Sequence, residues 1–309
     1  MKVSFIVPLY NCLPLTRAMA ASLQATLPAS LDYEVIFVDD GSTDGTRAWL
    51  ATLTPPFRFV LNEHNLGYAA ANNHGARLAR GKLLVLLNND LEFSPRWLEP
   101  MLAVHQRLGS RAGVVGNVQR RIDDGSVDHA GIFINLKAKP EHDTSLPPRW
   151  LRFCRRTRIA AAVTGACALV ERELWEKLGG FDENFSNGGE DVDFCFRIHR
   201  EGRLNAVALQ SVIRHHVSAS PGRKMRDEQN SRRLALKWRR ELEALPLRRW
   251  CWNYLCRFWT TPHDSADHVS ARSALFFALH LTSTPPPIAT AGMRAAMDHE
   301  LERWDRMLK

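Results

Sequence analysis

The stretch VSFIVPLYN at residues 3–11 decides the fold, together with EVIFVDDGSTDGT at residues 34–46. Each stretch begins as a short apolar run, which is typical of a buried strand, and ends in polar residues. Between the two stretches, apolar residues recur on one face of a helix at Leu15, Met19, Leu23 and Leu27. Strand and helix patterns go on alternating to residue 87. This alternation predicts an α/β fold with a doubly wound, mainly parallel sheet flanked by helices.

Polar residues gather where the predicted strands end. Ligands of doubly wound sheets bind at the carboxyl ends of the strands, so these residues predict a binding site within residues 1–93. They are Tyr10-Asn11, Asp39-Asp40, the stretch from Asn62 to Asn65, and Asn88-Asn89-Asp90.

The rest of the chain divides into two parts by pattern. Residues 94–220 mix helix and strand signals and, with residues 1–93, are expected to form one catalytic domain. Residues 221–309 are predicted to form a helical, Trp-rich and basic C-terminal extension. The run Pro285-Pro286-Pro287 is expected to separate a linker from a short final helix.

Composition excludes several classes of protein. The 309 residues are 45% hydrophobic and 24% charged, which is ordinary for a globular protein and excludes disorder and fibrous repeats. Six scattered cysteines without a C-x-x-C pair exclude a zinc ribbon and favour a reducing compartment. The start of the chain becomes polar too quickly for a signal peptide, so a cytoplasmic location is expected.

Asp39 and Asp40 adjoin an apolar strand end, where burial of a carboxylate without a partner is costly. A strand-to-helix turn would explain Ser42, Thr43 and the nearby glycines, because these residues cap helices and relax turns. It would not explain two carboxylates. A carboxylate at this place can accept a hydrogen bond from the imide of uracil or thymine, or from a ribose hydroxyl. The residues alone leave both interpretations open.

Asp90 follows the apolar run Leu83–Leu87, at the rim of the predicted sheet. A structural interpretation is that Asp90 caps the helix expected from Ser94-Pro95. The functional interpretation is a ligand of Mg²⁺ or Mn²⁺, since these ions take few carboxylates and complete their shell with phosphate oxygens. The pattern here is Asn-x-Asp, so it offers one anionic ligand.

Glu190, Asp191 and Asp193 place three carboxylates within four residues, after a glycine-rich loop. Carboxylates in the first turn of a helix are favoured by its dipole, which could account for Glu190 and Asp191. Arg197 lies four residues after Asp193, so we expect a structural ion pair between these two side chains.

These motifs together resemble the family 2 inverting glycosyltransferases of GT-A fold, in particular their rhamnosyltransferase-like branch. The resemblance covers about residues 3–240 in the same order, whereas residues 245–309 carry no motif of the family. The matching stretches are VPLYN at 7–11, DDGSTDGT at 39–46, NLGY at 65–68 with Asn73, LNND at 87–90, GGFDE at 179–183, EDVDFCFR at 190–197, and His215-His216 followed by Ser220.

The resemblance implies a nucleotide-sugar site in residues 1–93. Asp40 would contact the base, with Pro8, Tyr10 and Asn65 shaping its pocket, which weakly favours UDP or dTDP sugars as donors. The donor site would also include Gly67, Asn73 and Asn89.

The resemblance also implies a metal ligand and a general base. Asp90 would bind Mg²⁺ or Mn²⁺, although Asn88 replaces the first acid of the family's Asp-x-Asp element. His215 would help to hold the metal or the diphosphate, with His216 as the fallback. Asp191 would be the general base in the acceptor-side half of the domain, residues 94–220. The acceptor side would also include Glu190 and Gly165.

The predicted function is therefore metal-dependent, inverting transfer of a hexose or similar sugar to a hydroxyl group. The acceptor would be a glycan or a lipid-linked glycan in surface polysaccharide or lipopolysaccharide synthesis. The alternative is a non-catalytic nucleotide- or glycan-binding module of the same fold. A sugar nucleotidyltransferase would need a Gly-rich, Arg-bearing loop where Pro8-Leu9-Tyr10-Asn11 stands. A nucleic-acid partner is not expected, because carboxylates at the strand ends would repel phosphate.

Basic charge is concentrated in residues 221–262, with eleven Lys and Arg against four Asp and Glu, while the whole chain carries +8. Tryptophan recurs in the same segment, at Trp238, Trp250, Trp252 and Trp259. One interpretation is a helix that packs its aromatic side chains on the catalytic domain. The other is peripheral docking on an anionic membrane, such as the cytoplasmic face of the inner membrane.

Overall fold

The computed structural model of the chain describes residues 2–148, 150, 154, 156–216, 223–260 and 265–308. The chain divides into two compact units. The first unit contains residues 1–132 and 142–226, and the second contains residues 133–141 and 227–309. The predicted domain boundary between residues 220 and 221 lies outside the described residues, as does Ser220.

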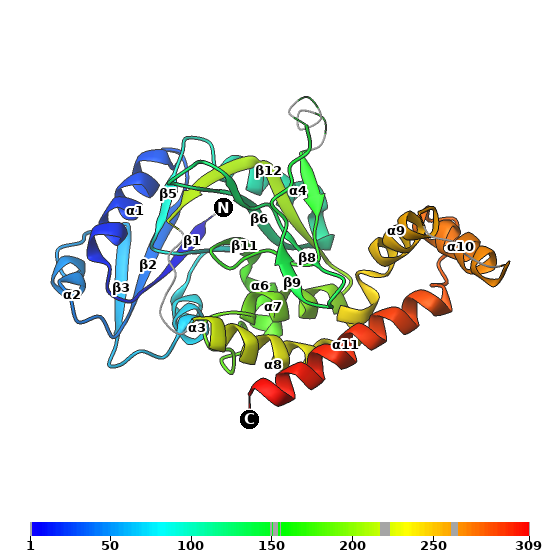
Figure 1. The fold of residues 1–309 in the computed structure, drawn as a ribbon. Helices are drawn as coiled ribbons and strands as arrows, with labels where there is room; N and C mark the ends of the chain where they lie inside the picture. The colour runs from blue at the N-terminus through cyan, green and yellow to red at the C-terminus, as the bar shows by residue number, and fades with distance from the viewer. Residues whose placement is uncertain are drawn as a thin grey trace. The chain divides into compact units, whose positions relative to one another are not determined.

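A ten-stranded mixed sheet forms the centre of the first unit (Figure 1), with its main strands in the order β10-β12-β6-β11-β4-β1-β2-β3. Strands β5 and β7 pair with β12 and β6, beside this main path. The strand bounds are β1 (Val3–Leu9), β2 (Tyr33–Asp40), β3 (Phe57–Asn62), β4 (Leu83–Leu87), β5 (Leu91–Phe93), β6 (Ala112–Arg121), β7 (Val127–His129), β10 (Thr157–Ile159), β11 (Cys167–Glu171) and β12 (Leu204–His215).

The four strands expected from the first ninety residues are present and parallel: β1 pairs with β2 and β4, and β2 pairs with β3. Helices cover both faces of the sheet (Figure 1). Side chains of α1, α2 and α4 join the main core cluster on one face, and α3, α6 and α7 pack on the other. Their bounds are α1 (Leu13–Thr26), α2 (Thr46–Leu50), α3 (Tyr68–Leu78), α4 (Leu98–Leu108), α6 (Arg172–Leu178) and α7 (Glu190–Arg200).

The antiparallel strands of the sheet bring distant segments to one edge. Strand β11 runs antiparallel to both β4 and β6, while the twelve-residue strand β12 runs parallel to β6. The short strand β5 pairs antiparallel with β12 so that Leu91 lies opposite His215. This register carries Asp90 and His215, 125 positions apart in sequence, to neighbouring places.

The helix expected from Pro95 begins three residues later, at Leu98. Arg96 has a positive φ of 66°, a left-handed conformation that a regular α-helix does not accept. The chain therefore turns at Arg96 before α4 starts.

The second unit contains a strand hairpin and helices. Strands β8 (Ile132–Ile134) and β9 (Pro140–His142) form the hairpin, most of which lies in this unit. The helices are α8 (Arg223–Ala244), which begins in the first unit, α9 (Leu247–Phe258), α10 (Ser265–Ala278) and α11 (Pro287–Met307). No helix in the described part of the chain is both long and apolar enough to span a bilayer.

The expectation of a short final helix is wrong, because α11 extends for 21 residues. Met293, Met297 and Trp304 recur along one face of α11 and are buried, so packing sustains the helix to its end. The hairpin residue Lys139 adds an ion pair of 2.9 Å to Glu300 on the same helix. Pro287 can begin a helix because its missing amide hydrogen is not needed there.

Candidate active site

Asp40 ends β2, and its carboxylate fixes the loop that follows β3. Oδ1 accepts hydrogen bonds from Asn62 Nδ2 at 2.8 Å and from the Leu66 amide at 3.0 Å, and Oδ2 accepts one from the Gly67 amide at 2.9 Å. The residue is 4% exposed. Since each carboxylate oxygen can accept two hydrogen bonds, Oδ2 can still accept one more donor. The contact between Asp40 and a nucleotide base stays a prediction, beside a structural role that the sequence did not reveal.

Asn11 joins the first two strand ends at the rim of the predicted pocket. Its Oδ1 accepts hydrogen bonds from the amides of Thr43, at 2.8 Å, and Asp44, at 3.2 Å, and its own amide donates to Ser42 Oγ. Asn11 has a φ of 57°, which Asn tolerates better than most residues. The neighbouring Tyr10 is 52% exposed and Asn65 is also exposed, so both side chains can be reached by a ligand.

Two residues predicted for the donor site have side-chain amides that are engaged within the protein. Asn73 Nδ2 donates to the Phe181 carbonyl at 2.9 Å and to Glu183 at 2.8 Å, and its Oδ1 accepts from the Phe181 amide. Asn73 thereby joins α3 to the glycine-rich turn before α7. Asn89 Nδ2 donates to Thr16 Oγ1 on α1 at 3.0 Å.

His215 lies between two carboxylates. Its Nε2 is 3.3 Å from Asp90 Oδ1, and its Nδ1 is 3.4 Å from Asp128 Oδ2. The amide of His216 donates to the Asp90 carbonyl at 3.0 Å. The structure therefore brings the ring of His215 to Asp90, as the predicted metal site requires. Asp128 was missed by the sequence analysis, because β7 is three residues long and its pairing with β6 is not visible as a local pattern.

The two carboxylates control the charge of His215. Burial favours the neutral ring, but the hydrogen bonds to Asp128 and Asp90 outweigh burial and raise the pKa of His215 to about 9. The hydrogen bond from His215 lowers the pKa of Asp128 in turn. Without a bound ion, the imidazolium form of His215 thus bridges the two acids near neutral pH.

Asp90 and His215 fit one side of a divalent ion. Asp90 Oδ1 is buried and lies 3.3 Å from His215 Nε2, and the side-chain oxygen of Asn88, two residues earlier, is buried without a hydrogen-bond partner. Among the described residues, no three His, Cys, Asp or Glu side chains converge to hold an ion by themselves. A carboxylate and an imidazole would therefore supply part of the shell, with phosphate oxygens and water supplying the rest.

Asp191 is held at the N-terminus of α7 by backbone donors. Its Oδ2 accepts a hydrogen bond from the Gly165 amide at 3.0 Å, and its Oδ1 accepts one from the Val192 amide at 2.8 Å. Burial nevertheless raises the pKa of Asp191, against these two hydrogen bonds. A carboxylate with a raised pKa in a fixed orientation is suited to accept a proton.

Two further ionisable residues, Glu190 and Tyr68, lie near Asp191. Burial and the neighbouring charge of Asp191 raise the pKa of Glu190 to about 8. Tyr68 donates a hydrogen bond from its hydroxyl to the Gly165 carbonyl at 2.8 Å. Burial raises the pKa of Tyr68, and so do the charges of Glu190, Asp191 and Asp90. The charges of the predicted general base, Asp191, and of the predicted metal ligand, Asp90, therefore both influence the hydroxyl of Tyr68.

Asp193, the third acid of the α7 motif, has a different partner. Its Oδ2 forms an ion pair of 2.9 Å with Arg197 Nε, and its side chain is fully buried. The predicted structural ion pair between Asp193 and Arg197 is confirmed.

The sequence profile described as Glycosyl transferase family 2 matches residues 4–179. The chain is 35% identical over 233 residues to the O-antigen biosynthesis protein RfbC of Myxococcus xanthus, covering 71% of this chain and 18% of that protein. It is 29% identical over 231 residues to the N-acetylglucosaminyl-diphospho-decaprenol L-rhamnosyltransferase of Mycobacterium tuberculosis, covering 68% of this chain and 74% of that protein. The chain spans less than a third of the length of the first relatives that it matches.

Among solved structures, the chain resembles GalNAc-T7, whose crystal structure contains UDP, GalNAc and Mn²⁺. The TM-score is 0.64 at 18% identity, over 81% of this chain and 50% of that one. This likeness confirms the GT-A fold that the sequence motifs predicted. By its sequence profile, which covers more than half of its length, the chain belongs to glycosyltransferase family 2.

Proposed function

We propose that this protein is a metal-dependent, inverting glycosyltransferase that moves a sugar from a nucleoside diphosphate to a hydroxyl acceptor. One observation carries the proposal: two consecutive residues contact both parts of the predicted site. The Gly165 amide donates to Asp191 Oδ2 at 3.0 Å, and the Ala166 carbonyl accepts from the amide of Asn88, two residues before Asp90, at 2.9 Å. The predicted general base, Asp191, and the predicted metal ligand, Asp90, therefore lie in the same region of the domain, although they are distant in sequence. A single displacement needs both of them there.

In the proposed reaction, Asp191 accepts the proton of the acceptor hydroxyl as its oxygen attacks the anomeric carbon. The bond to the diphosphate breaks as the new glycosidic bond forms, so the configuration inverts in one step. The backbone amides of Gly165 and Val192 keep the carboxylate oriented during proton transfer. No covalent glycosyl-enzyme forms, so this reaction needs no carboxylate nucleophile.

Asp90 and His215 would hold a Mg²⁺ or Mn²⁺ ion at the edge of the sheet. When bound, such an ion neutralises charge on the diphosphate leaving group as a Lewis acid. The buried Oδ1 of Asp90, which lies 3.3 Å from His215 Nε2, supports this role. So does the Mn²⁺ in the crystal structure of GalNAc-T7, which has the same fold.

The donor is proposed to be a UDP or dTDP sugar. Oδ2 of Asp40 can accept one further hydrogen bond, which the imide N–H of uracil or thymine can donate. The exposed side chains of Tyr10 and Asn65 lie beside the strand ends where the base would bind.

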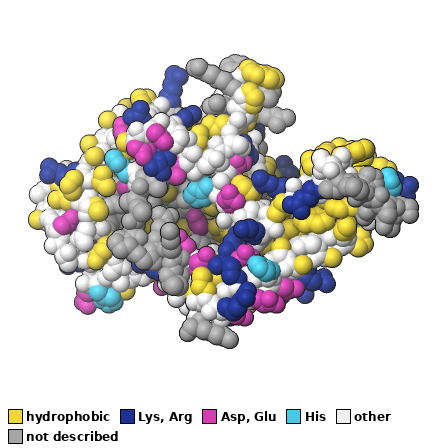
Figure 2. All heavy atoms as spheres, viewed as in Figure 1, with side chains coloured by type: hydrophobic (Ala, Val, Ile, Leu, Met, Phe, Trp, Pro, Cys, Tyr) yellow, Lys and Arg dark blue, Asp and Glu magenta, His cyan; other side chains and the backbone are white. Residues whose placement is uncertain are grey.

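The acceptor is proposed to be a glycan or lipid-linked glycan of a surface polysaccharide pathway. The names of RfbC and of the decaprenol-linked rhamnosyltransferase support this acceptor class. An anionic membrane is proposed as a further partner of the second unit, at the cytoplasmic face of the inner membrane. Hydrophobic side chains gather over α9 and α10 beside Lys and Arg (Figure 2). The exposed hydrophobic residues of these helices and of the position after each helix include Trp252, Trp259, Val269, Phe276 and Leu279.

A donor screen tests the proposal. Nucleotide sugars are added to the purified protein with Mn²⁺, Mg²⁺ or EDTA, and the melting temperature is measured. A true donor must raise it in a metal-dependent way, because a ligand that binds the folded state stabilises that state by mass action. The donor found is then incubated with acceptors, and the anomeric configuration of the product is read by NMR. A retained configuration would contradict the mechanism, and binding without turnover over all acceptors would favour a non-catalytic binding module.

A further inference from the structure

Asp128 lies across the imidazole ring of His215 from Asp90. Oδ2 of Asp128 is 3.4 Å from Nδ1 of His215, whereas Asp90 Oδ1 is 3.3 Å from Nε2. The side chains of His215 and Asp128 are 15% and 20% exposed, so solvent has limited access to this hydrogen bond.

Strand pairing in the sheet fixes the position of Asp128 relative to His215. Strand β7 pairs antiparallel with β6, with His129 opposite Gln119, and β6 pairs with β12, with Arg121 opposite His215. Nδ1 of His142 is 3.3 Å from the backbone carbonyl of Asp128. The contact between Asp128 and His215 therefore depends on strand pairing and not on a mobile surface side chain.

The two nitrogens of an imidazole ring point in diverging directions. A carboxylate on Nδ1 therefore cannot share an ion with a carboxylate on Nε2, and Asp128 is not placed as a third ligand of the proposed metal. It is placed to accept the Nδ1–H of His215. A neutral imidazole carries one N–H, so a proton kept on Nδ1 leaves the lone pair on Nε2, on the side of Asp90.

We propose that Asp128 is a positioning residue that fixes the tautomer and orientation of His215, so that Nε2 can bind the divalent ion together with Asp90. This inference depends on the metal site of the proposed function. Carboxylates that accept from the second nitrogen of a metal-binding histidine typically change metal affinity by about 10- to 100-fold. Loss of the Asp128 carboxylate is expected to change metal affinity by a factor in this range, and only through its effect on His215.

A double-mutant cycle on Mn²⁺ affinity tests the inference. Mn²⁺ alone is titrated into the full-length protein, and the free ion is measured by electron paramagnetic resonance. Asp128→Ala is expected to weaken Mn²⁺ binding by about 10- to 100-fold. In a His215→Ala background, the same Asp128→Ala change is expected to have no further effect. Asp124→Asn is the charge-matched control, because it removes an exposed acid from the turn between β6 and β7 and is expected to leave affinity unchanged.

The results separate this inference from the proposed function. Unchanged affinity in Asp128→Ala, or an equal loss in both backgrounds, would overturn the inference and leave the metal site standing. Absence of Mn²⁺ binding by the wild-type protein would overturn the metal site and the inference with it. If Asp128→Ala fails to fold, Asp128→Asn replaces it. Its amide keeps the shape but is a weaker acceptor, so a smaller loss that again vanishes without His215 is expected.

A second measurement reads the tautomer directly. Long-range nitrogen-15 NMR of histidine-labelled protein with Mg²⁺ distinguishes a protonated Nδ1 from a protonated Nε2. The wild-type His215 is expected to carry its proton on Nδ1, and Asp128→Asn to populate the other tautomer. A protonated Nε2 in the Mg²⁺-loaded wild-type protein would contradict the inference, because that nitrogen could not then bind the ion.

Discussion

The Gly165 peptide connects Tyr68 to Asp191: its carbonyl accepts the Tyr68 hydroxyl at 2.8 Å, and its amide donates to Asp191 Oδ2 at 3.0 Å. A Cβ atom at position 165 would lie 3.1 Å from the Tyr68 hydroxyl oxygen, so the close approach favours glycine. Gly67, bound to Asp40, directly precedes Tyr68. Hydrogen bonds and peptide links thus connect Asp40, in the predicted pocket for the nucleotide base, to Asp191, the predicted general base.

The first prediction concerns Asp191→Asn. The amide oxygen of Asn can still accept a backbone hydrogen bond, but Asn cannot take a proton from the acceptor. We expect the transfer rate to fall by about 10²- to 10⁴-fold, the usual contribution of a general base, with donor affinity nearly unchanged. Initial rates and calorimetric titration of the donor measure the two quantities. Transfer at the wild-type rate would show that another group is the base.

Tyr68→Phe is expected to have a milder effect than Asp191→Asn. The substitution removes the hydroxyl that holds the Gly165 carbonyl but keeps the aromatic ring that stacks against Phe181. We expect a lower kcat with an unchanged donor KM, because the Gly165 peptide then orients Asp191 less firmly. Thermal unfolding measures the stability of the variant. If stability and activity fall together, Tyr68 has a general structural role instead.

The third prediction concerns Glu190 and the pH dependence of stability. The pKa of Glu190 is raised in the folded protein to about 8, from an ordinary value of 4.5. Its contribution to stability is therefore fully present below pH 4.5 and is lost as the pH rises through about 8. The charges nearby are those of Asp191, which disfavours ionisation of Glu190, and the helix N-terminus of α7, which favours it.

Glu190→Gln removes this titration, so its free energy of unfolding should fall less than that of the wild type between pH 5 and pH 8. Chemical denaturation at several pH values measures the difference. Glu63→Gln, at an exposed position, is the control and should follow the wild-type curve. Parallel curves for the wild type and Glu190→Gln would mean that Glu190 ionises in the folded protein as readily as in the unfolded chain.

The fourth prediction concerns the packing of α3 on the sheet. A Cβ atom on Gly75 would lie 2.6 Å from Ile6 Cγ2 and 3.0 Å from Val38 Cγ2, closer than van der Waals contact permits. Gly75→Ala is expected to destabilise the protein by about 1–3 kcal/mol, despite the higher helix propensity of Ala. Arg77→Ala, on the exposed side of the same helix, is the control. Equal unfolding midpoints for the two variants would contradict this account.

The parallel half of the fold could be predicted because each strand is a continuous apolar run and each helix has its own periodicity. Stretches 3–9 and 34–40, for example, are almost fully buried as strands β1 and β2. Strands β5 and β7 could not be predicted in this way. Each is three residues long, and its pairing with β12 or β6 decides its conformation.

The candidate site shows the same limit. Asp40, Asp90 and Asp191 could be selected from sequence because each carboxylate adjoins an apolar strand or a glycine-rich turn. The sequence could not show that Asp40 is largely occupied by backbone amides, or that Asp128 faces His215. Both facts depend on contacts between residues more than 20 positions apart.

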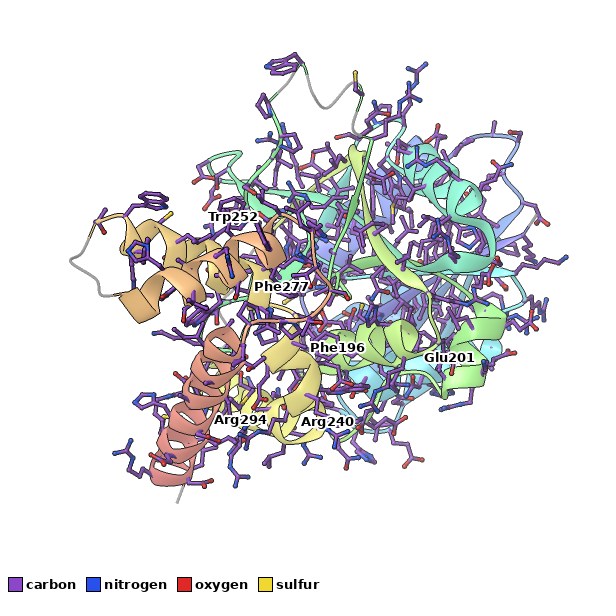
Figure 3. The ribbon with its side chains drawn as sticks, turned by 90° about the vertical axis from the view of Figure 1, so that its right-hand side faces the viewer. Phe196, Glu201, Arg240, Trp252, Phe277 and Arg294 are labelled. Atoms are coloured by element: carbon purple, nitrogen blue, oxygen red, sulfur yellow. The ribbon has the colours of Figure 1, made fainter. Side chains whose placement is uncertain are left out.

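The second unit presents an apolar face that the sequence only partly indicated. Val269 and Phe276 of α10, and Leu279 directly after the helix, are exposed, and Leu281 is 69% exposed. Two arginines of α9 are already engaged: Arg248 donates to the Phe277 carbonyl, and Arg249 stacks on Phe133. Figure 3 labels Phe277 on α10 and Trp252 on α9. Loss of Arg248 would therefore disturb packing as well as charge.

The last prediction is that this face of α9 and α10 binds vesicles that contain anionic lipid. Phe276→Ser with Leu279→Ser is expected to reduce sedimentation with such vesicles, because each side chain is about half exposed and would insert between headgroups. Arg272→Gln should weaken binding less, since one basic residue near an anionic surface contributes on the order of 1 kcal/mol. Leu236→Ser, at an exposed position on α8, is the matched control. Added salt should reduce the binding. Equal recovery of the wild-type protein in the supernatant with neutral and with anionic vesicles would exclude docking and leave this face for a protein contact.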